Sequence, residues 1–113
     1  MVYFVATPIG NLGDISLRAL DTLREADVIF CEETRHSLKL LNYFETKKPL
    51  VACHKFNEFS ATEKLLALVK EGKNVAVVTD AGTPVTSDPG YLLVQALRDA
   101  GAEYTLIPGA CAF

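Results

Sequence analysis

Short apolar runs recur five times along the chain and are separated by longer segments of mixed polarity. Within each run, apolar residues follow one another with little polar alternation. This is the pattern of strands that are covered on both faces in a parallel sheet. We therefore expect strands at residues 2–6, 28–31, 50–53, 75–78 and 104–107.

The segments between the apolar runs have a helical period. Two of them carry an apolar stripe at spacings typical of an amphipathic helix. The stripes consist of Ala61, Leu65, Leu68 and Val69, and of Leu93, Ala96, Leu97 and Ala100. The order strand, helix, strand occurs four times along the chain. Because such crossovers are right-handed, this order predicts an open sheet. The sequence thus predicts one α/β domain over residues 1–113, with a mostly parallel five-stranded sheet and helices on both faces.

Several residues predict where the helices begin and end. Residues 60–63 read S-A-T-E, a capping box in which the Ser and Glu side chains satisfy free amides at a helix start. Gly72 and Gly101 lie where two helices should end in a left-handed residue. The first helix is expected to begin near Asp14 or Ile15.

Composition and charge narrow the class of protein. Half of the residues are hydrophobic and 22% are charged, which indicates a compact globular chain. The net charge of −3 gives no basic field, so affinity for nucleic acid cannot be inferred from charge. Cys31, Cys53 and Cys111 are odd in number and widely spaced, which favours reduced, buried thiols in a cytoplasmic protein and no metal site. No stretch is long and apolar enough to predict a membrane segment.

Glycine and proline are concentrated after three of the predicted strands. The segments are T-P-I-G-N-L-G-D at 7–14, D-A-G-T-P at 80–84 and I-P-G-A at 107–110. In an open parallel sheet, ligands bind outside the carboxyl ends of the strands, where these segments should lie. Asp80 could then accept hydrogen bonds from ribose hydroxyls or an amine, while Gly82 allows a ligand to approach the backbone.

Each of these segments also has a plainer interpretation. The first and third could be ordinary connections, and none is the G-x-G-x-x-G of a dinucleotide site. In the second, Ser87 or Asp88 is a good N-cap and Pro89 suits a first helical position. Helix initiation therefore explains residues 87–89 but not residues 80–84.

Two polar clusters follow the second and third predicted strands and should face the same rim. They read C-E-E-T-R-H at 31–36 and C-H-K-F-N-E at 53–58. Glu32 and Glu33 could simply oppose a helix dipole. Alternatively, they could contact substrate or remove a proton. The candidate bases are Glu32, Glu33 and His36, and the candidate substrate contacts are Arg35, His54 and Asn57.

Taken in order, TPIGNLGDIS, EETRHSLKLL, DAGTPVTSDPG and IPGACA resemble the N-terminal half of the tetrapyrrole methylase superfamily. The resemblance covers essentially the whole chain. It is strongest to the branch that methylates a cytidine 2′-O-ribose in 16S rRNA, since porphyrin-type relatives carry a different, GDP-like sequence in the second segment.

The resemblance implies S-adenosylmethionine as methyl donor, with no metal, bound between this domain and a C-terminal domain. It also implies a homodimer that acts on 16S rRNA or the small ribosomal subunit, away from membranes. The tail after the fifth predicted strand looks like the first turn of a helix cut short, so we expect a C-terminal domain beyond this chain. The donor residues implied are Pro8, Gly10, Asp80, Ala81, Gly82, Thr83, Ser87, Pro108, Gly109 and Ala110.

Other functions stay open at this point. The enzyme could methylate a tetrapyrrole precursor or another small molecule, or the chain could be a non-catalytic nucleotide-binding or dimerisation module. If RNA is the substrate, its phosphates must be met by a further domain, by a dimer partner, or by local patches of lysines, which could equally be solvated surface. The lysines concerned are Lys39, Lys47, Lys48 and Lys55.

Overall fold

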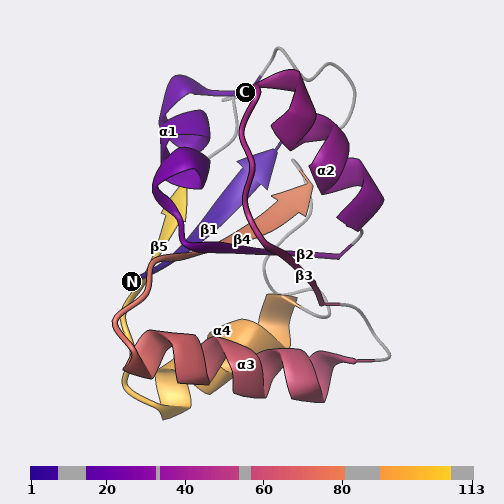
Figure 1. The fold of residues 1–113 in the computed structure, drawn as a ribbon. Helices are drawn as coiled ribbons and strands as arrows, with labels where there is room; N and C mark the ends of the chain where they lie inside the picture. Colours follow the sequence, from indigo (N-terminus) through magenta and orange to yellow (C-terminus); the bar gives the residue numbers. More distant parts are fainter. Residues whose placement is uncertain (8–14, 33, 54–56, 81–89, 108–113) are drawn as a thin grey trace.

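The computed structural model describes residues 1–7, 15–32, 34–53, 57–80 and 90–107. Within these residues, strands and helices alternate along the chain (Figure 1). The elements are β1 (Val2–Thr7), α1 (Leu17–Glu25), β2 (Val28–Cys31), α2 (Thr34–Tyr43), β3 (Leu50–Ala52), α3 (Glu58–Lys70), β4 (Val75–Asp80), α4 (Gly90–Asp99) and β5 (Tyr104–Ile107).

The five strands form one sheet in the order β3-β2-β4-β1-β5, and every pair of neighbours is parallel. The predicted α/β class and five-stranded parallel sheet are therefore confirmed. β1 and β4 continue to Thr7 and Asp80, beyond the predicted ends, because the two strands pair with each other along their whole length. β3 ends at Ala52, one residue earlier than expected.

Helices cover both faces of the sheet, as predicted. α1 and α2 lie on one face and α3 and α4 on the other (Figure 1). The chain crosses the sheet in one direction from β1 to β3 and returns from β3 to β5. Because crossovers are right-handed, reversing the direction moves the helices to the opposite face. No helix among the described residues is long and apolar enough to cross a membrane.

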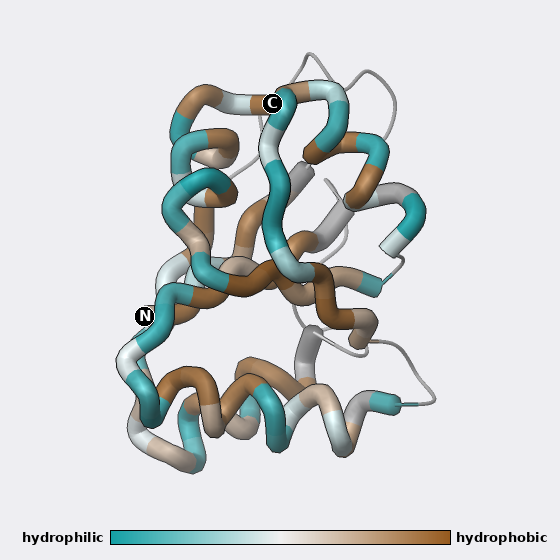
Figure 2. Tube along the Cα trace, viewed as in Figure 1, coloured by the Kyte–Doolittle hydropathy of each residue, from teal (hydrophilic) through white to brown (hydrophobic). Residues whose placement is uncertain are grey.

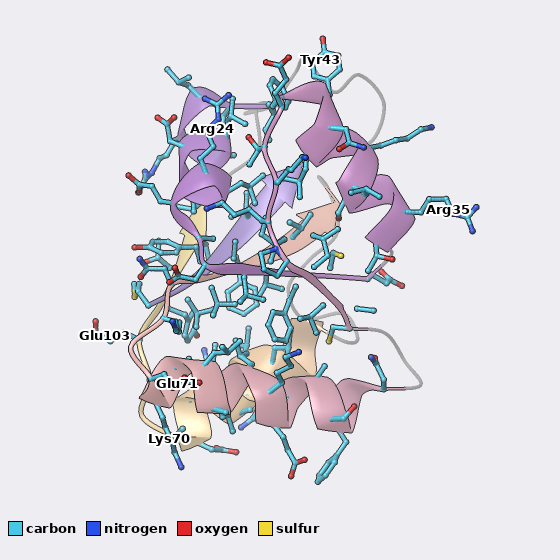
Figure 3. All side chains as sticks on the ribbon, in the orientation of Figure 1. Arg24, Arg35, Tyr43, Lys70, Glu71 and Glu103 are labelled. Carbon is cyan, nitrogen blue, oxygen red and sulfur yellow. The ribbon has the colours of Figure 1, made fainter. Side chains whose placement is uncertain are left out.

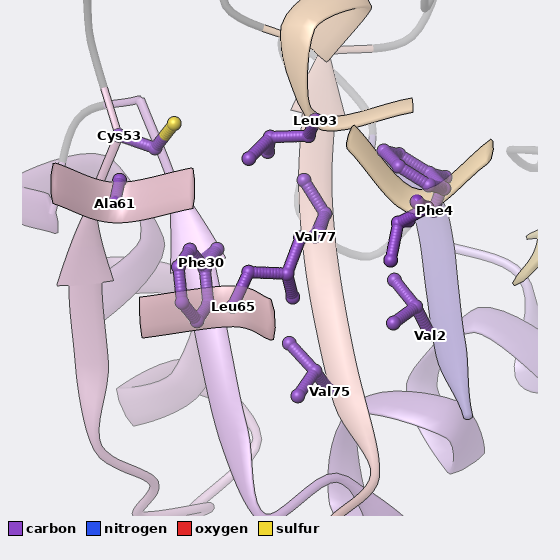
Figure 4. Close-up of a cluster of buried hydrophobic side chains, with 10 residues drawn as sticks. Val2, Phe4, Phe30, Cys53, Ala61, Leu65, Val75, Val77 and Leu93 are labelled. Carbon is purple, nitrogen blue, oxygen red and sulfur yellow. The ribbon is translucent and has the colours of Figure 1, made fainter. Parts of the chain in front are cut away.

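Alternate side chains of the strands supply two hydrophobic clusters, one on each face. Phe4, Phe30 and Val77 pack against α3 and α4, where Leu65 and Leu93 are fully buried (Figure 4). The other cluster contains strand residues that pack on α1 and α2, namely Val5, Ile29, Ala76 and Ile107. Hydrophobic residues run along the strands, whereas hydrophobic and hydrophilic residues alternate along the helices (Figure 2). The unalternating runs of the sequence are thus explained by burial on both faces.

The left-handed helix ends were predicted correctly, and the starts of α1 and α3 were not. Gly72 has φ +79° after α3 and Gly101 has φ +70° after α4. α1 begins at Leu17, later than expected, because the Ser16 side chain caps it: Oγ accepts a hydrogen bond from the Ala19 amide at 3.1 Å. The caps proposed at Ser87 or Asp88 lie outside the described residues.

The capping box at residues 60–63 is wrong. α3 begins at Glu58, so Ser60 lies in its first turn, and the Ser60 hydroxyl donates to the Asn57 carbonyl at 3.0 Å. Asn57 is the N-cap residue, and its Nδ2 donates to the Ala52 carbonyl at 2.8 Å. This hydrogen bond to the end of β3 fixes where α3 starts, and the spacing of residues within the segment 60–63 could not show it.

Two of the three cysteines lie in the described residues, and both are buried thiols, as predicted. Cys53 belongs to the cluster beneath α3 and α4, whereas side-chain alternation along β2 places Cys31 on the other face, with Ile29. Burial raises the pKa of the Cys31 thiol, and a hydrogen bond with Ser37 opposes that shift. Cys111 lies outside the described residues.

The buried position of Leu65 predicts a large effect on stability. Leu65→Ala should lower the free energy of unfolding by about 2–5 kcal/mol, because it leaves a cavity between α3 and the sheet. Leu17→Ala is the matched control, since Leu17 is 75% exposed and Leu65 is 0% exposed. Its effect should stay within about 0.5 kcal/mol. Urea denaturation measures both, and equal losses would contradict the packing described.

The raised pKa of Cys31 predicts a loss of stability in alkali. Below about pH 8 the thiol is neutral in both states and contributes no pH dependence. Above it, the unfolded thiol ionises more readily than the folded thiol, so rising pH favours unfolding. Urea denaturation between pH 8 and 10 should therefore show a steeper loss in the unchanged protein than in Cys31→Ala. Parallel pH profiles would show that the thiol does not titrate differently in the two states.

Candidate functional site

The carboxyl ends of all five strands meet at one edge of the sheet, because every pair is parallel. Thr7 at the end of β1 pairs with Asp80 at the end of β4, and Ile107 of β5 pairs with Val5 of β1. The strands that precede the three glycine- and proline-rich segments are therefore the adjacent strands β4, β1 and β5. Segments that are far apart in the sequence begin side by side.

Two strands of this group, β1 and β4, send their helices to opposite faces of the sheet. α1 follows β1 and packs on one face, and α4 follows β4 and packs on the other (Figure 1). The place where neighbouring parallel strands lead to helices on opposite faces is called a topological switch point. In open α/β sheets, ligands bind at the carboxyl ends of the strands at such a point. Neighbouring strands are about 4.8 Å apart, so the backbones at Thr7 and Asp80 are within reach of one small molecule.

The polar clusters occupy the other half of the same edge. β2 precedes Glu32, β3 precedes Asn57, and β2 lies next to β4. Glu32 and Arg35 are both exposed, and Arg35 points away from the sheet (Figure 3). The edge thus has a glycine-rich half on β4, β1 and β5 and a polar half on β3 and β2. The two halves meet between β2 and β4.

Asn57, a candidate substrate contact, has a structural task in the polar half. Its amide nitrogen donates to the Ala52 carbonyl at 2.8 Å and closes the connection between β3 and α3. Asn57 is partly buried, in contrast to Arg35. Of these two candidates, Arg35 is the side chain that is open to an incoming ligand.

A buried polar contact that sequence analysis missed fixes the start of α2. Ser37 is 3% exposed and hydrogen-bonds with the Cys31 thiol at the end of β2. The Cys31 sulfur also lies 4.0 Å from the Val51 carbonyl oxygen. These contacts hold the first turn of α2, which carries the outward-pointing Arg35, at the sheet edge. The available signal was the helical spacing of Ser37 with Leu40 and Leu41, both buried.

Most of the predicted donor residues lie outside the described residues. The structure places the backbone of Asp80 in β4 and that of His36 in α2, and it describes Glu32, Arg35 and Asn57 as above. The predicted positions outside the described residues are Pro8, Gly10, Glu33, His54, Ala81, Gly82, Thr83, Ser87, Pro108, Gly109 and Ala110. Among the described residues, no group of three His, Cys, Asp or Glu side chains could hold a metal ion.

Comparison with known proteins agrees with this architecture. Among solved structures, the uroporphyrin-III-C-methyltransferase from Thermus thermophilus superposes with a TM-score of 0.72 at 28% identity, over 96% of this chain and 46% of that one. The fold described above is therefore shared with a methyltransferase of known structure.

Curated relatives are more similar in sequence. The ribosomal RNA small subunit methyltransferase I of Mycoplasmopsis pulmonis is 49% identical over 112 residues, which is 99% of this chain and 50% of the relative. That of Thermotoga maritima is 51% identical over 108 residues, which is 96% of this chain and 49% of the relative. The chain thus spans about half the length of these relatives. The family model for the tetrapyrrole (corrin/porphyrin) methylases matches residues 1–113, and the chain belongs to this family.

Proposed function

We propose that this chain is the N-terminal half of an S-adenosylmethionine-dependent methyltransferase that methylates the ribose 2′-hydroxyl of a cytidine in 16S rRNA. The observation that carries the proposal is the adjacency of β4, β1 and β5, because all three glycine-rich segments follow these strands at one edge of the sheet. The relatives named as small-subunit rRNA methyltransferases, at about half identity, support the choice of substrate.

The glycine-rich half of the edge would hold the donor. Asp80 ends the central strand β4, so its carboxylate can accept hydrogen bonds from the donor's ribose hydroxyls or amine. Gly10 and Gly82 follow neighbouring strands and let the donor approach the backbone. Further contacts come from Pro8, Ala81, Thr83, Ser87 and residues 108–110. S-adenosylmethionine supplies an electrophilic methyl group on a sulfonium.

The polar half would receive the nucleophile. Methyl transfer is an in-line displacement, so the protein's main contribution is to hold the reacting groups in register and exclude water. Because β2 lies beside β4, groups that follow β2 are next to the donor half. A carboxylate at Glu32 or Glu33, or the His36 imidazole, would accept the proton of the ribose hydroxyl.

The complete enzyme would contain more than this chain. We propose a C-terminal domain that completes the site, which the roughly twofold length of the curated relatives supports. We propose a homodimer that works in the cytoplasm, where its ribosomal substrate is found. With a net charge of −3 in this chain, most of the charge that neutralises RNA must come from the remaining domain, the partner or a local patch.

A small-molecule substrate is the second candidate. The T. thermophilus structure is named a uroporphyrin-III-C-methyltransferase, and it shares this fold. Its 28% identity is well below the 49% and 51% of the rRNA methyltransferases. Sequence similarity therefore favours RNA over a tetrapyrrole.

Donor binding can be tested without RNA. Calorimetric titration of S-adenosylhomocysteine into the complete protein should give one site per chain. Asp80→Ala should weaken binding roughly ten- to a hundredfold, because hydrogen bonds to a charged group are lost. Gly82→Val should abolish binding, since its side chain would occupy the place of the ligand. Asp21→Ala, at an exposed position on α1, is the control. Unchanged affinity in both site variants would rule out a donor site on residues 80–83.

Substrate choice needs a separate assay. With labelled donor, the complete enzyme should methylate small ribosomal subunits that lack the modification, and digestion of the product should place the label on a cytidine 2′-oxygen. A uroporphyrinogen-type precursor should remain unlabelled under the same conditions. Labelling of the tetrapyrrole instead of the RNA would establish the second candidate function.

A further inference from the structure

The outward side of α2 carries an unusual set of residues. Ser37, Leu40 and Leu41 are buried against the sheet and α1. Exposed positions recur at i, i+3, i+4, i+7 and i+8, so they form one continuous strip about 12 Å long. We call this strip the α2 stripe; it consists of Arg35, Leu38, Lys39, Asn42 and Tyr43.

The charge of the α2 stripe differs from that of the rest of the chain. α2 (Thr34–Tyr43) holds two of the 11 Lys and Arg residues, Arg35 and Lys39, and none of the 14 Asp and Glu residues, although Glu32 and Glu33 immediately precede it. On α1 and α3, by contrast, acidic and basic residues are interspersed. A chain of net charge −3 therefore presents a cationic helix on this side, which is complementary to a polyanion.

The α2 stripe also exposes apolar surface. Leu38 is 51% exposed and Tyr43 is 60% exposed. The Tyr43 ring packs edge-on against Phe44, with centroids 4.8 Å apart and an interplanar angle of 76°. Phe44 in turn packs against the buried cluster beneath α1 and α2. Tyr43 is thus an exposed aromatic ring held in place by Phe44, which suits stacking by an unpaired base.

The place of α2 in the fold links the stripe to the candidate site. α2 follows β2 and so begins at the carboxyl edge, in the polar half, where the Cys31–Ser37 hydrogen bond holds its first turn. Arg35 and Tyr43 lie at opposite ends of the helix, and both point away from the sheet (Figure 3). The stripe therefore runs from the rim of the site outward.

We propose that the α2 stripe binds the substrate RNA, with Arg35 and Lys39 on phosphates and Tyr43 stacked on an unpaired base. This inference rests on the proposed function and names the surface that leads the RNA to the site. Two cations one helical turn apart, with no acidic residue between them, suit a phosphate backbone better than a protein partner. An aromatic ring beside cations is the combination that binds single-stranded nucleic acid.

Binding of the complete enzyme to small ribosomal subunits that lack the methyl group tests the two cations. Arg35→Ala/Lys39→Ala should weaken binding roughly tenfold near physiological salt, and should reduce the salt slope by about 1.4 if the contacted strand is single. Lys64→Ala/Lys70→Ala removes the same charge from exposed positions on α3, on the opposite face, and should bind normally. Equal affinity losses in the two double variants, or none in either, would overturn the proposal.

Two substitutions of Tyr43, one without and one with an aromatic ring, test whether the residue stacks on a base. Tyr43→Leu should weaken binding at least about fivefold, whereas Tyr43→Phe should retain it, because stacking needs the ring and not the hydroxyl. In methylation assays the losses should appear as a higher KM with little change in kcat. A normal RNA affinity combined with a changed oligomeric state in sedimentation would instead make the stripe a protein interface and overturn the proposal.

Titration with S-adenosylhomocysteine in the same preparations separates the two proposals. Normal donor affinity in the stripe variants with weakened RNA binding supports the α2 stripe. If the unchanged enzyme neither bound the donor nor methylated RNA, the proposed function would be refuted. The RNA affinities of the stripe variants would then still show whether the α2 stripe binds RNA. Normal donor and RNA binding in every stripe variant would refute the stripe alone.

Discussion

The parallel pairing of β1 with β4 is the constraint on which the rest of the structure depends. Both strands lie inside the sheet and are paired from Val2 and Val75 to Thr7 and Asp80. Their side chains enter both hydrophobic clusters, with Val75 and Val77 on one side and Ala76 on the other. Because both faces are covered, the strands cannot slip by one residue without exchanging the two clusters. The pairing thus fixes the register of the central strand ends.

This register makes a binding edge possible. Parallel strands end together, and the connections after β1 and β4 go to helices on opposite faces. The fold supplies the sheet edge, and the residues that follow the strands supply its chemistry. Division of the edge into a glycine-rich half and a polar half follows from the strand order. It suits the methyl transfer proposed above, in which the donor would lie on one side and the nucleophile on the other.

The face of α2 away from the sheet is largely exposed among the described residues, which makes its composition informative. A solvated helix face tolerates mixed charges, as on α1 and α3. The absence of acidic residues from α2, together with an exposed tyrosine, has no cause in the packing of the described residues. Its inner face, in contrast, is explained by burial, and Ser37 fits there because the Cys31 thiol provides its hydrogen-bond partner.

The sequence by itself determined the class of fold, because unalternating apolar runs can be buried only between two layers of helices. It also determined the helix ends at Gly72 and Gly101, where a left-handed residue is a local requirement. The motifs that carry the family resemblance are likewise local. The tertiary structure alone decided the strand order β3-β2-β4-β1-β5, which depends on packing between distant segments and brings Thr7 beside Asp80. It also decided that α3 starts after Asn57 and not at Ser60, because the bond that fixes this start reaches back to Ala52 in β3.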